Sequence, residues 1–316
     1  MEPDILTSSA KVLFVFINCR VLATIVVLFG IAANVANSIV FYRQGLGSSM
    51  NISFFSLSLS NLFSVVALLW MNFCNTIIVE YLELYNISND IVYLTGGWPS
   101  GCALRITSWI TAYMTAERCL CVAFPLKVKT IATPLIIKTI TLGNVLALIP
   151  EYASVYYDWS FIPGKNRTVL GLAFRSNRAE TKGLVFTFHA ALAVTSLVAL
   201  ATFTFILIFQ LKQRSNWRLS SLANSKQNEA ISARDKRAVT LVIAVAILLI
   251  VCYSPIVSTS LGSSFAPEFS VAGRQANLFN ACWSFAFLLG AISSSVNIIL
   301  YYLMSSKYRL TFQRML

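Results

Sequence analysis

Long stretches without a charged side chain constrain this chain more than any other feature of its sequence. Five of them cover residues 21–42, 44–79, 183–211, 238–267 and 275–306. A helix that crosses a bilayer needs about 20 consecutive, mainly apolar residues. Each stretch therefore predicts one membrane-spanning helix with some flanking loop.

Two further apolar segments carry one internal basic residue each. Residues 91–116 contain Arg105, and residues 130–150 contain Lys138. With 57% hydrophobic and only 11% charged residues, the chain cannot cover a water-facing surface. Strand-like alternation is absent from these segments, so a membrane barrel is not expected. We predict an all-α membrane protein, a bundle of seven transmembrane helices followed by a short amphipathic helix.

The distribution of basic residues indicates which end of the bundle faces the cytoplasm. With the N-terminus outside, the inner segments hold more Lys and Arg than the outer ones, as the positive-inside rule requires. Sequons at Asn86 and Asn166 fall in loops placed outside and predict glycosylation there. A contrary basic cluster follows the fourth helix: Lys165, Arg167, Arg175, Arg178 and Lys182. We expect a multi-pass plasma-membrane protein with an extracellular N-terminus and no cleavable signal peptide.

This topology divides the chain into three parts. Residues 1–20 are expected to form a short extracellular N-terminus and residues 21–304 the seven-helix domain. Residues 305–316 alternate basic and aromatic side chains, which predicts a cytoplasmic helix lying on the inner leaflet. Residues 157–182 form the longest outer loop, and residues 212–237 form a basic inner loop.

The segment E-R-C-L-C-V-A-F-P-L ends the third predicted helix. Glu117 precedes Arg118 and neutralises a charge that is costly near the membrane interior. Pro125 sets a turn that projects Leu126 into the cytoplasm. A snorkelling arginine would also mark a membrane boundary, but it does not account for the offset to Pro-Leu. The segment resembles the D/E-R-Y and P-L signature of rhodopsin-like (class A) G-protein-coupled receptors, with Cys119 in place of the aromatic residue.

The resemblance extends along the chain in order. Asn61 stands where that class has Asp, Tyr253 where it has Trp, and Ile298 where it has Pro. Tyr308 matches the aromatic residue of the membrane-parallel helix. The resemblance implies a coupling and activation set of Glu117, Arg118, Pro125, Leu126, Asp235, Asn297 and Tyr301. It also implies an activation core of Asn34, Asn61, Cys252, Tyr253 and Pro255.

A narrower likeness lies in phrases such as T-G-G-W-P and R-I-T-S-W-I-T-A. These are similar to chemosensory and orphan receptors of molluscs and other invertebrates. The likeness implies a chemosensory receptor that binds an extracellular ligand within the helix bundle and activates a heterotrimeric G protein. A neuropeptide or small-transmitter receptor of the same fold is the alternative.

The resemblance also implies a switch at the inner face. Asp235 lies twenty residues before Pro255, about 30 Å along a helix. It either pairs with Arg118 and holds the inner face closed, or neighbours Lys236 and Arg237 in water. Pro255 removes a backbone hydrogen bond and kinks the sixth helix. Ligand contacts above that kink would favour an outward swing below it.

Two departures from the class carry expectations of their own. Asn61 removes the carboxylate of the mid-membrane sodium pocket, so sodium is not expected to modulate agonist affinity. Cys102 lies sixteen residues before Arg118, about 24 Å along a helix, which is too deep for the usual outer disulfide. The loop 157–182 contains no cysteine, so that disulfide is expected to be absent.

Candidate ligand-contacting residues lie in the outer half of the bundle. Arg105 is an intramembrane charge and therefore a functional-site hypothesis. It either meets an anionic group such as a carboxylate, or pairs with Glu151 or a backbone carbonyl. His189, the only histidine, is either a pocket donor or a hydrogen-bonded core residue. The aromatic residues that either line a pocket or fill the core are Tyr253, Trp283 and Phe287.

Other classes of membrane protein are less consistent with the sequence. A transporter needs polar residues along a path or inverted repeats, and a light sensor needs a lysine within residues 275–306, which contain none. Without a nucleophile–base or metal constellation, we expect no enzyme activity, no metal and no cofactor. The expected partners are a heterotrimeric G protein, an extracellular small molecule or peptide, and the lipid bilayer, but not nucleic acid.

Overall fold

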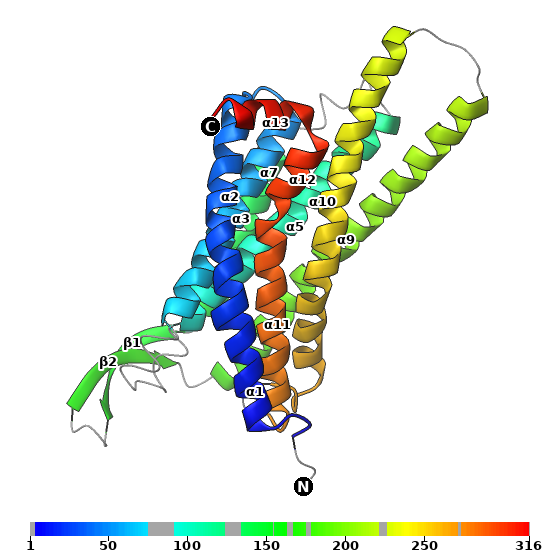
Figure 1. Cartoon of the computed structure of the whole chain (residues 1–316). Coiled ribbons are helices and arrows are strands. Elements are labelled where there is room, and N and C mark those ends of the chain that lie inside the picture. Colours follow the sequence, from blue (N-terminus) through cyan, green and yellow to red (C-terminus); the bar gives the residue numbers. More distant parts are fainter. Residues whose placement is uncertain are drawn as a thin grey trace.

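The protein is a bundle of long helices that run side by side (Figure 1). The computed structural model describes residues 4–74, 92–123, 134–153, 155–162, 167–174, 178–220, 226–270 and 273–315. In these ranges the helical columns, in chain order, are α1 (Ser8–Val15) with η1 (Phe16–Ala23) and α2 (Thr24–Arg43), α3 (Ser49–Cys74), η3 (Tyr93–Gly97) with α5 (Trp98–Ala123), α7 (Pro134–Leu146) with α8 (Ile149–Ala153), α9 (Arg178–Ser220), α10 (Lys226–Phe265), and α11 (Ala276–Ser295) with α12 (Asn297–Met304). This is the all-α seven-helix bundle that the sequence predicts.

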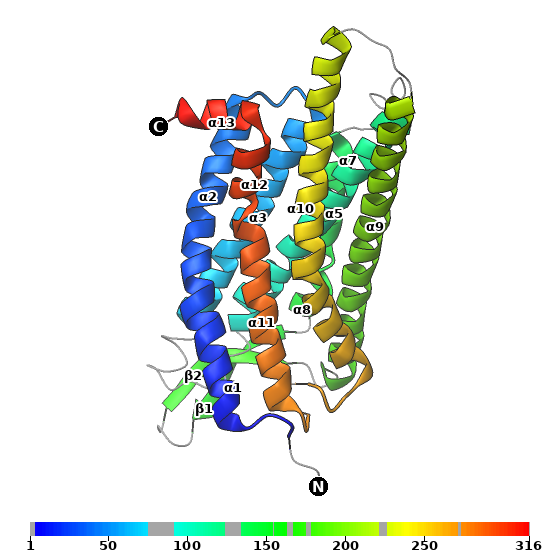
Figure 2. The same cartoon turned by 45° about the vertical axis from the view of Figure 1, so that its right-hand side comes forward.

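The ends of the bundle differ in what they carry. The N-terminus lies at one end, and α13 (Ser306–Gln313) lies across the other (Figure 1). Near α13, α9 and α10 extend beyond the neighbouring helices (Figure 2). A chain that crosses the membrane an odd number of times must have its two termini on opposite sides, as is seen here.

Five columns are long and apolar enough to span a membrane among the residues that the structure describes. Each of them overlaps one of the five charge-free stretches of the sequence. The two others are the columns that hold Arg105 and Lys138. Most residues of α5 are buried between its neighbours, so this helix is shielded from lipid by protein and needs fewer apolar side chains.

The first helix begins at Ser8, well before residue 21, where the sequence reasoning started it. Thr7 caps this helix, because its side chain accepts a hydrogen bond from the Ala10 amide at 3.3 Å. Asn18 then donates to the Ser284 hydroxyl on α11 at 3.0 Å. Much of the segment 1–20, predicted as a tail, is therefore part of the first helical column. The single charge of Arg20 interrupted the apolar run but does not end the helix.

The loop predicted at residues 157–182 contains a β-hairpin. Strand β1 (Val155–Ile162) pairs antiparallel with β2 (Arg167–Phe174), from Val155 opposite Phe174 to Ile162 opposite Arg167. Both strands are rich in β-branched, aromatic and other large apolar residues, which favour extended structure. The hairpin lies at the same end of the bundle as the N-terminus, and α9 begins shortly after it, at Arg178 (Figures 1 and 2).

The seventh helix breaks at Val296 although it lacks the expected proline. Two side-chain amides bond to carbonyls just before the break: Asn34 to Ser294 at 2.7 Å and Asn297 to Ser293 at 3.3 Å. Side-chain donors that insert into a helix ladder interrupt it as a proline does. Gly30 allows this approach, because a Cβ atom there would overlap the side chain of Ser295. The seventh helix is therefore interrupted at Val296 even though Ile298 stands where rhodopsin-like receptors have proline.

Pro255 lies inside α10, as predicted. It has no amide hydrogen to donate to the carbonyl four residues earlier, that of Val251. The Ser254 hydroxyl donates to that carbonyl at 3.3 Å. The sequence Ser-Pro thus removes one backbone hydrogen bond and supplies a side-chain replacement.

Candidate ligand site and inner face

The C-terminal end of α5 carries a buried ion pair. Arg118 Nη2 lies 3.2 Å from Glu117 Oε1, and the side chains are 19% and 4% exposed. The nearly enclosed carboxylate neutralises the guanidinium, which lowers the cost of holding it at this depth. Pro125 and Leu126 lie outside the described residues. Asp235 belongs to α10, but its side chain is also outside what the structure describes.

An aromatic cluster joins four helices next to this end. Tyr301 of α12 lies 5.1 Å, ring to ring, from both Phe41 of α2 and Phe54 of α3. Tyr308 of α13 lies 5.6 Å from Tyr301 and donates to Asn37 Oδ1 at 2.5 Å. Burial raises the pKa of the Tyr308 phenol, so it stays a donor.

The sequence reasoning identified Tyr301 and Tyr308 but missed Phe41, Phe54 and Asn37. Their common signal is an aromatic or amide side chain in the last turns before the first inner loop or the first turns after it. The cluster anchors α13 to the bundle, so the short last helix is a packed element.

The predicted activation core lies in the interior, distributed over several contacts. Asn34 and Asn297 meet at the break of the seventh helix, while Asn61 accepts from the Thr107 hydroxyl of α5 at 3.0 Å. All three asparagines are buried. Cys252 and Tyr253 are also buried, in the middle of α10.

A second group of buried polar residues includes Arg105, in the N-terminal half of α5. Arg105 is 5% exposed, and its Nε and Nη2 atoms have no hydrogen-bond partner among the residues described. Helix α5 packs against α9, which carries the buried His189, and against α10, which carries the buried Tyr253. The structure thus brings together three of the predicted ligand residues from three helices.

His189 is 5% exposed, and neither ring nitrogen has a hydrogen-bond partner in the described part of the chain. Its ring packs at 4.6 Å from that of Trp98, at the start of α5. Of the two interpretations open from the sequence, these contacts favour a pocket donor over a hydrogen-bonded core residue. Arg105 pairs with no carboxylate among the described side chains, and the Glu151 side chain lies outside them.

Trp283 and Phe287 belong to a different group. Their rings lie 5.5 Å apart on α11, and Trp283 also packs against Phe279 at 6.2 Å. Phe287 packs against a buried cluster that includes Val27 and Val65 of the first two columns. These contacts favour a core role for Phe287 over a place beside Arg105.

All seven cysteines lie in the described residues, and none of them forms a disulfide there. Cys102 is buried within α5 and donates to the Asn144 carbonyl of α7 at 3.3 Å. It therefore holds two helices together through a hydrogen bond rather than a disulfide. The glycosylation candidates Asn86 and Asn166 lie outside the described residues.

A helical bundle with membrane-spanning apolar columns, termini at opposite ends and an ion pair at one mouth defines a seven-transmembrane protein of the receptor type. Residues 21–316 match the family model described as serpentine type 7TM GPCR chemoreceptor Srw, so the chain belongs to this family of G-protein-coupled chemoreceptors. A search of curated proteins gives no match.

Membership of this family confirms the predictions of a G-protein-coupled receptor and of a chemoreceptor. The protein is a receptor and not an enzyme. The likeness to rhodopsin-like and molluscan receptors stays a prediction.

Proposed function

We propose that this protein is a plasma-membrane chemoreceptor with an extracellular N-terminus, which binds its ligand inside the bundle and activates a heterotrimeric G protein. The observation that carries the proposal is the Glu117–Arg118 ion pair at the inner end of α5. Family membership favours a chemosensory ligand over a neuropeptide or transmitter.

The ion pair is suited to a switch at the inner face. A guanidinium held by a neighbouring carboxylate can exchange that partner for the backbone carbonyls of an inserted helix. Pro255 weakens the ladder of α10 two residues from Tyr253, beside the Arg105 group, which favours bending there. An agonist shifts this equilibrium only by its difference in affinity for the two states.

Replacing Arg118 with alanine tests coupling. In membranes that contain the receptor and a panel of heterotrimeric G proteins, Arg118→Ala is expected to reduce receptor-dependent nucleotide exchange to background. Lys307→Ala is the matched control, since Lys307 is an exposed cation at the same end of the bundle. Exchange that is unchanged in Arg118→Ala would contradict the proposed role.

The Arg105 group is the proposed ligand site. A buried guanidinium without a carboxylate partner is costly in a low-dielectric interior, and an anion that binds it relieves that cost. His189 and Tyr253 add a donor and an aromatic wall from two other helices. We therefore expect a ligand with one carboxylate on a mainly apolar body.

A panel of small carboxylic acids and their methyl esters tests this site. The acids are expected to activate the receptor and the esters to be inactive. For an active acid, Arg105→Gln should raise the half-maximal concentration by about tenfold to a hundredfold, roughly 1.4 to 3 kcal/mol of charge-assisted binding. Equal responses to acid and ester, or no effect of Arg105→Gln, would refute the assignment while leaving coupling through Arg118 intact.

A further inference from the structure

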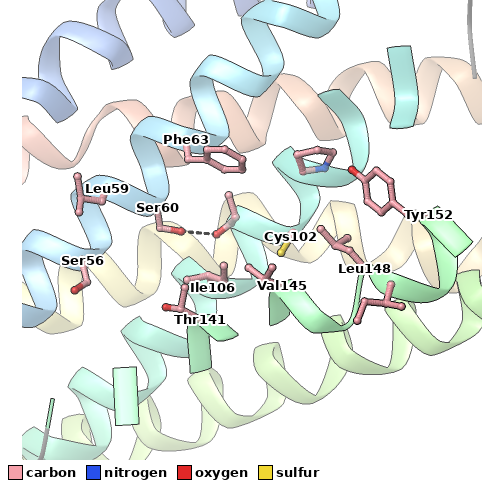
Figure 3. Close-up of a pocket in the computed structure, with 13 residues that line it drawn as sticks. Ser56, Leu59, Ser60, Phe63, Cys102, Ile106, Thr141, Val145, Leu148 and Tyr152 are labelled. Atoms are coloured by element: carbon pink, nitrogen blue, oxygen red, sulfur yellow. Dashed lines mark hydrogen bonds between the residues drawn. The ribbon is translucent and has the colours of Figure 1, made fainter. Parts of the chain in front are cut away.

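A cavity of about 900 Å³ lies on the flank of the bundle, between α3, α5 and α7–α8 (Figure 3). It contains none of the predicted ligand residues. Ser56 and Tyr152 lie toward opposite ends of it, so the cavity is elongated (Figure 3). Its size is in the range of pockets that hold a small molecule.

The mouth of this cavity faces the hydrocarbon of the bilayer. Phe63 of α3 and Val145 of α7 line it and are 56% and 49% exposed. Helix α3 is long and apolar enough to span a membrane, and α7 is a shorter apolar helix of the same bundle. A molecule that enters here must first dissolve in the membrane.

Two hydrogen bonds join the helices that line the cavity. The Ser60 hydroxyl donates to the Ala103 carbonyl at 2.8 Å and ties α3 to α5 (Figure 3). Cys102 ties α5 to α7 through the Asn144 carbonyl. The small side chains at Ser60 and Ala103 leave room between the helices where larger ones would fill it.

The lining selects an uncharged occupant. Among the described residues that line the cavity, none carries a formal charge, and most are aliphatic or aromatic. A phosphate or ammonium headgroup would therefore lose its hydration without gaining a partner.

One lining hydroxyl is left without a partner. On the same helix, Ser53 and Ser58 donate to the carbonyls four residues earlier, those of Ser49 and Phe54. Ser56 makes no such bond, and its hydroxyl has no hydrogen-bond partner among the described residues. Facing hydrocarbon, an unpaired hydroxyl is unfavourable, and a ligand oxygen can satisfy it. On the opposite wall, Thr141 donates to the Ile137 carbonyl at 2.9 Å, which leaves its oxygen able to accept.

We propose that this cavity is a second ligand site, which binds a neutral lipophilic alcohol that enters from the bilayer and hydrogen-bonds to Ser56. Ser56 lies seven residues beyond the start of α3 at Ser49, about 10 Å along the helix. The polar group of a structural phospholipid stays at the interface and does not reach that depth. The hydroxyl of a small alcohol dissolved in the membrane can reach it.

Photolabelling with a long-chain alcohol that carries a diazirine tests this site in receptor-containing membranes. Labelled peptides should include residues around Phe63 or Val145, and excess unlabelled alcohol should suppress the labelling. Ser56→Ala should reduce it several-fold. Ser58→Ala is the matched control, because the Ser58 hydroxyl is buried and already bonded, and it should label like the natural protein.

A second variant keeps the test independent of the hydrogen bond. Val145→Trp places a large side chain at the exposed mouth and should abolish labelling, while nucleotide exchange through Arg118 reports that the variant is folded. Labelling that survives in both Ser56→Ala and Val145→Trp would overturn the site. Suppression by phosphatidylcholine equal to that by the alcohol would overturn the ligand class. Neither result bears on the proposed coupling.

Discussion

At the scale of single residues, Asn61 shows how one substitution changes what the interior can bind. Its Oδ1 atom accepts from Thr107, and its Nδ2 atom has no hydrogen-bond partner among the described residues. The amide therefore presents its donor side to the interior and carries no charge to balance a cation. The carboxylate that occupies this position in rhodopsin-like receptors has no donor group and carries the negative charge that balances a cation.

Sodium sensitivity follows from that difference. In the natural protein, replacing choline chloride with sodium chloride is expected to leave basal nucleotide exchange unchanged. Asn61→Asp places a carboxylate beside a buried hydroxyl, so sodium should bind and lower basal exchange, by about tenfold if the ion stabilises the inactive state by roughly 1.4 kcal/mol. A clear sodium effect on the natural protein would show that the amide does not have the consequence inferred here.

At the scale of helices and strands, the contacts that shape and position each element are not visible as a periodicity in the sequence. The charge-free stretches predicted the helices, because lipid requires long apolar spans. The break at Val296, by contrast, depends on Asn34, which is 260 residues from the carbonyl it binds. The hairpin β1–β2 was missed, because residues 157–182 were predicted only as the longest outer loop.

The attachment of α13 gives a test at this scale. Tyr308→Phe removes the donor to Asn37, whose own Nδ2 atom already has no partner among the described residues. Leaving a buried amide wholly unpaired should cost about 1 to 3 kcal/mol. We expect a lower melting temperature in detergent and faster proteolysis after α12.

Tyr302→Phe is the control for that change, because Tyr302 is 36% exposed and lies beside Arg309 rather than in the cluster. If the two variants melt alike, the Tyr308 hydrogen bond does not hold α13 in place.

For the whole molecule, the sequence predicted the class and the plan of the bundle, and the contacts between helices decided the sites. Arg105 and His189 were both candidates, yet only the fold shows that Nε and Nη2 of Arg105 and both ring nitrogens of His189 are buried without partners in the described part of the chain. The flank cavity had no sequence signal, because serine, alanine and aliphatic residues are common in every span. Burial and spacing across helices are properties of the assembled bundle.

The proposed ligand site at Arg105 and the flank cavity lie at similar depths along α5, because Cys102, Ala103 and Ile106, which flank Arg105 in the sequence, line the cavity. The proposed coupling region lies further along the same helix, at Arg118. The Arg105 group and the inner ion pair lie on one helix, α5, while the flank cavity lies outside the bundle core. We therefore expect that an acid bound at Arg105 does not block the route by which an alcohol enters the flank cavity from the bilayer.

The orientation of the bundle tests the central claim most directly, because Arg118 can meet a G protein only from the cytoplasmic side. Epitope tags on the two termini, stained in intact and in permeabilised cells, measure it. The N-terminal tag should be stained in intact cells, and the C-terminal tag, after α13, only once the membrane is permeabilised. The reverse pattern would place the Glu117–Arg118 end outside the cell and contradict the account.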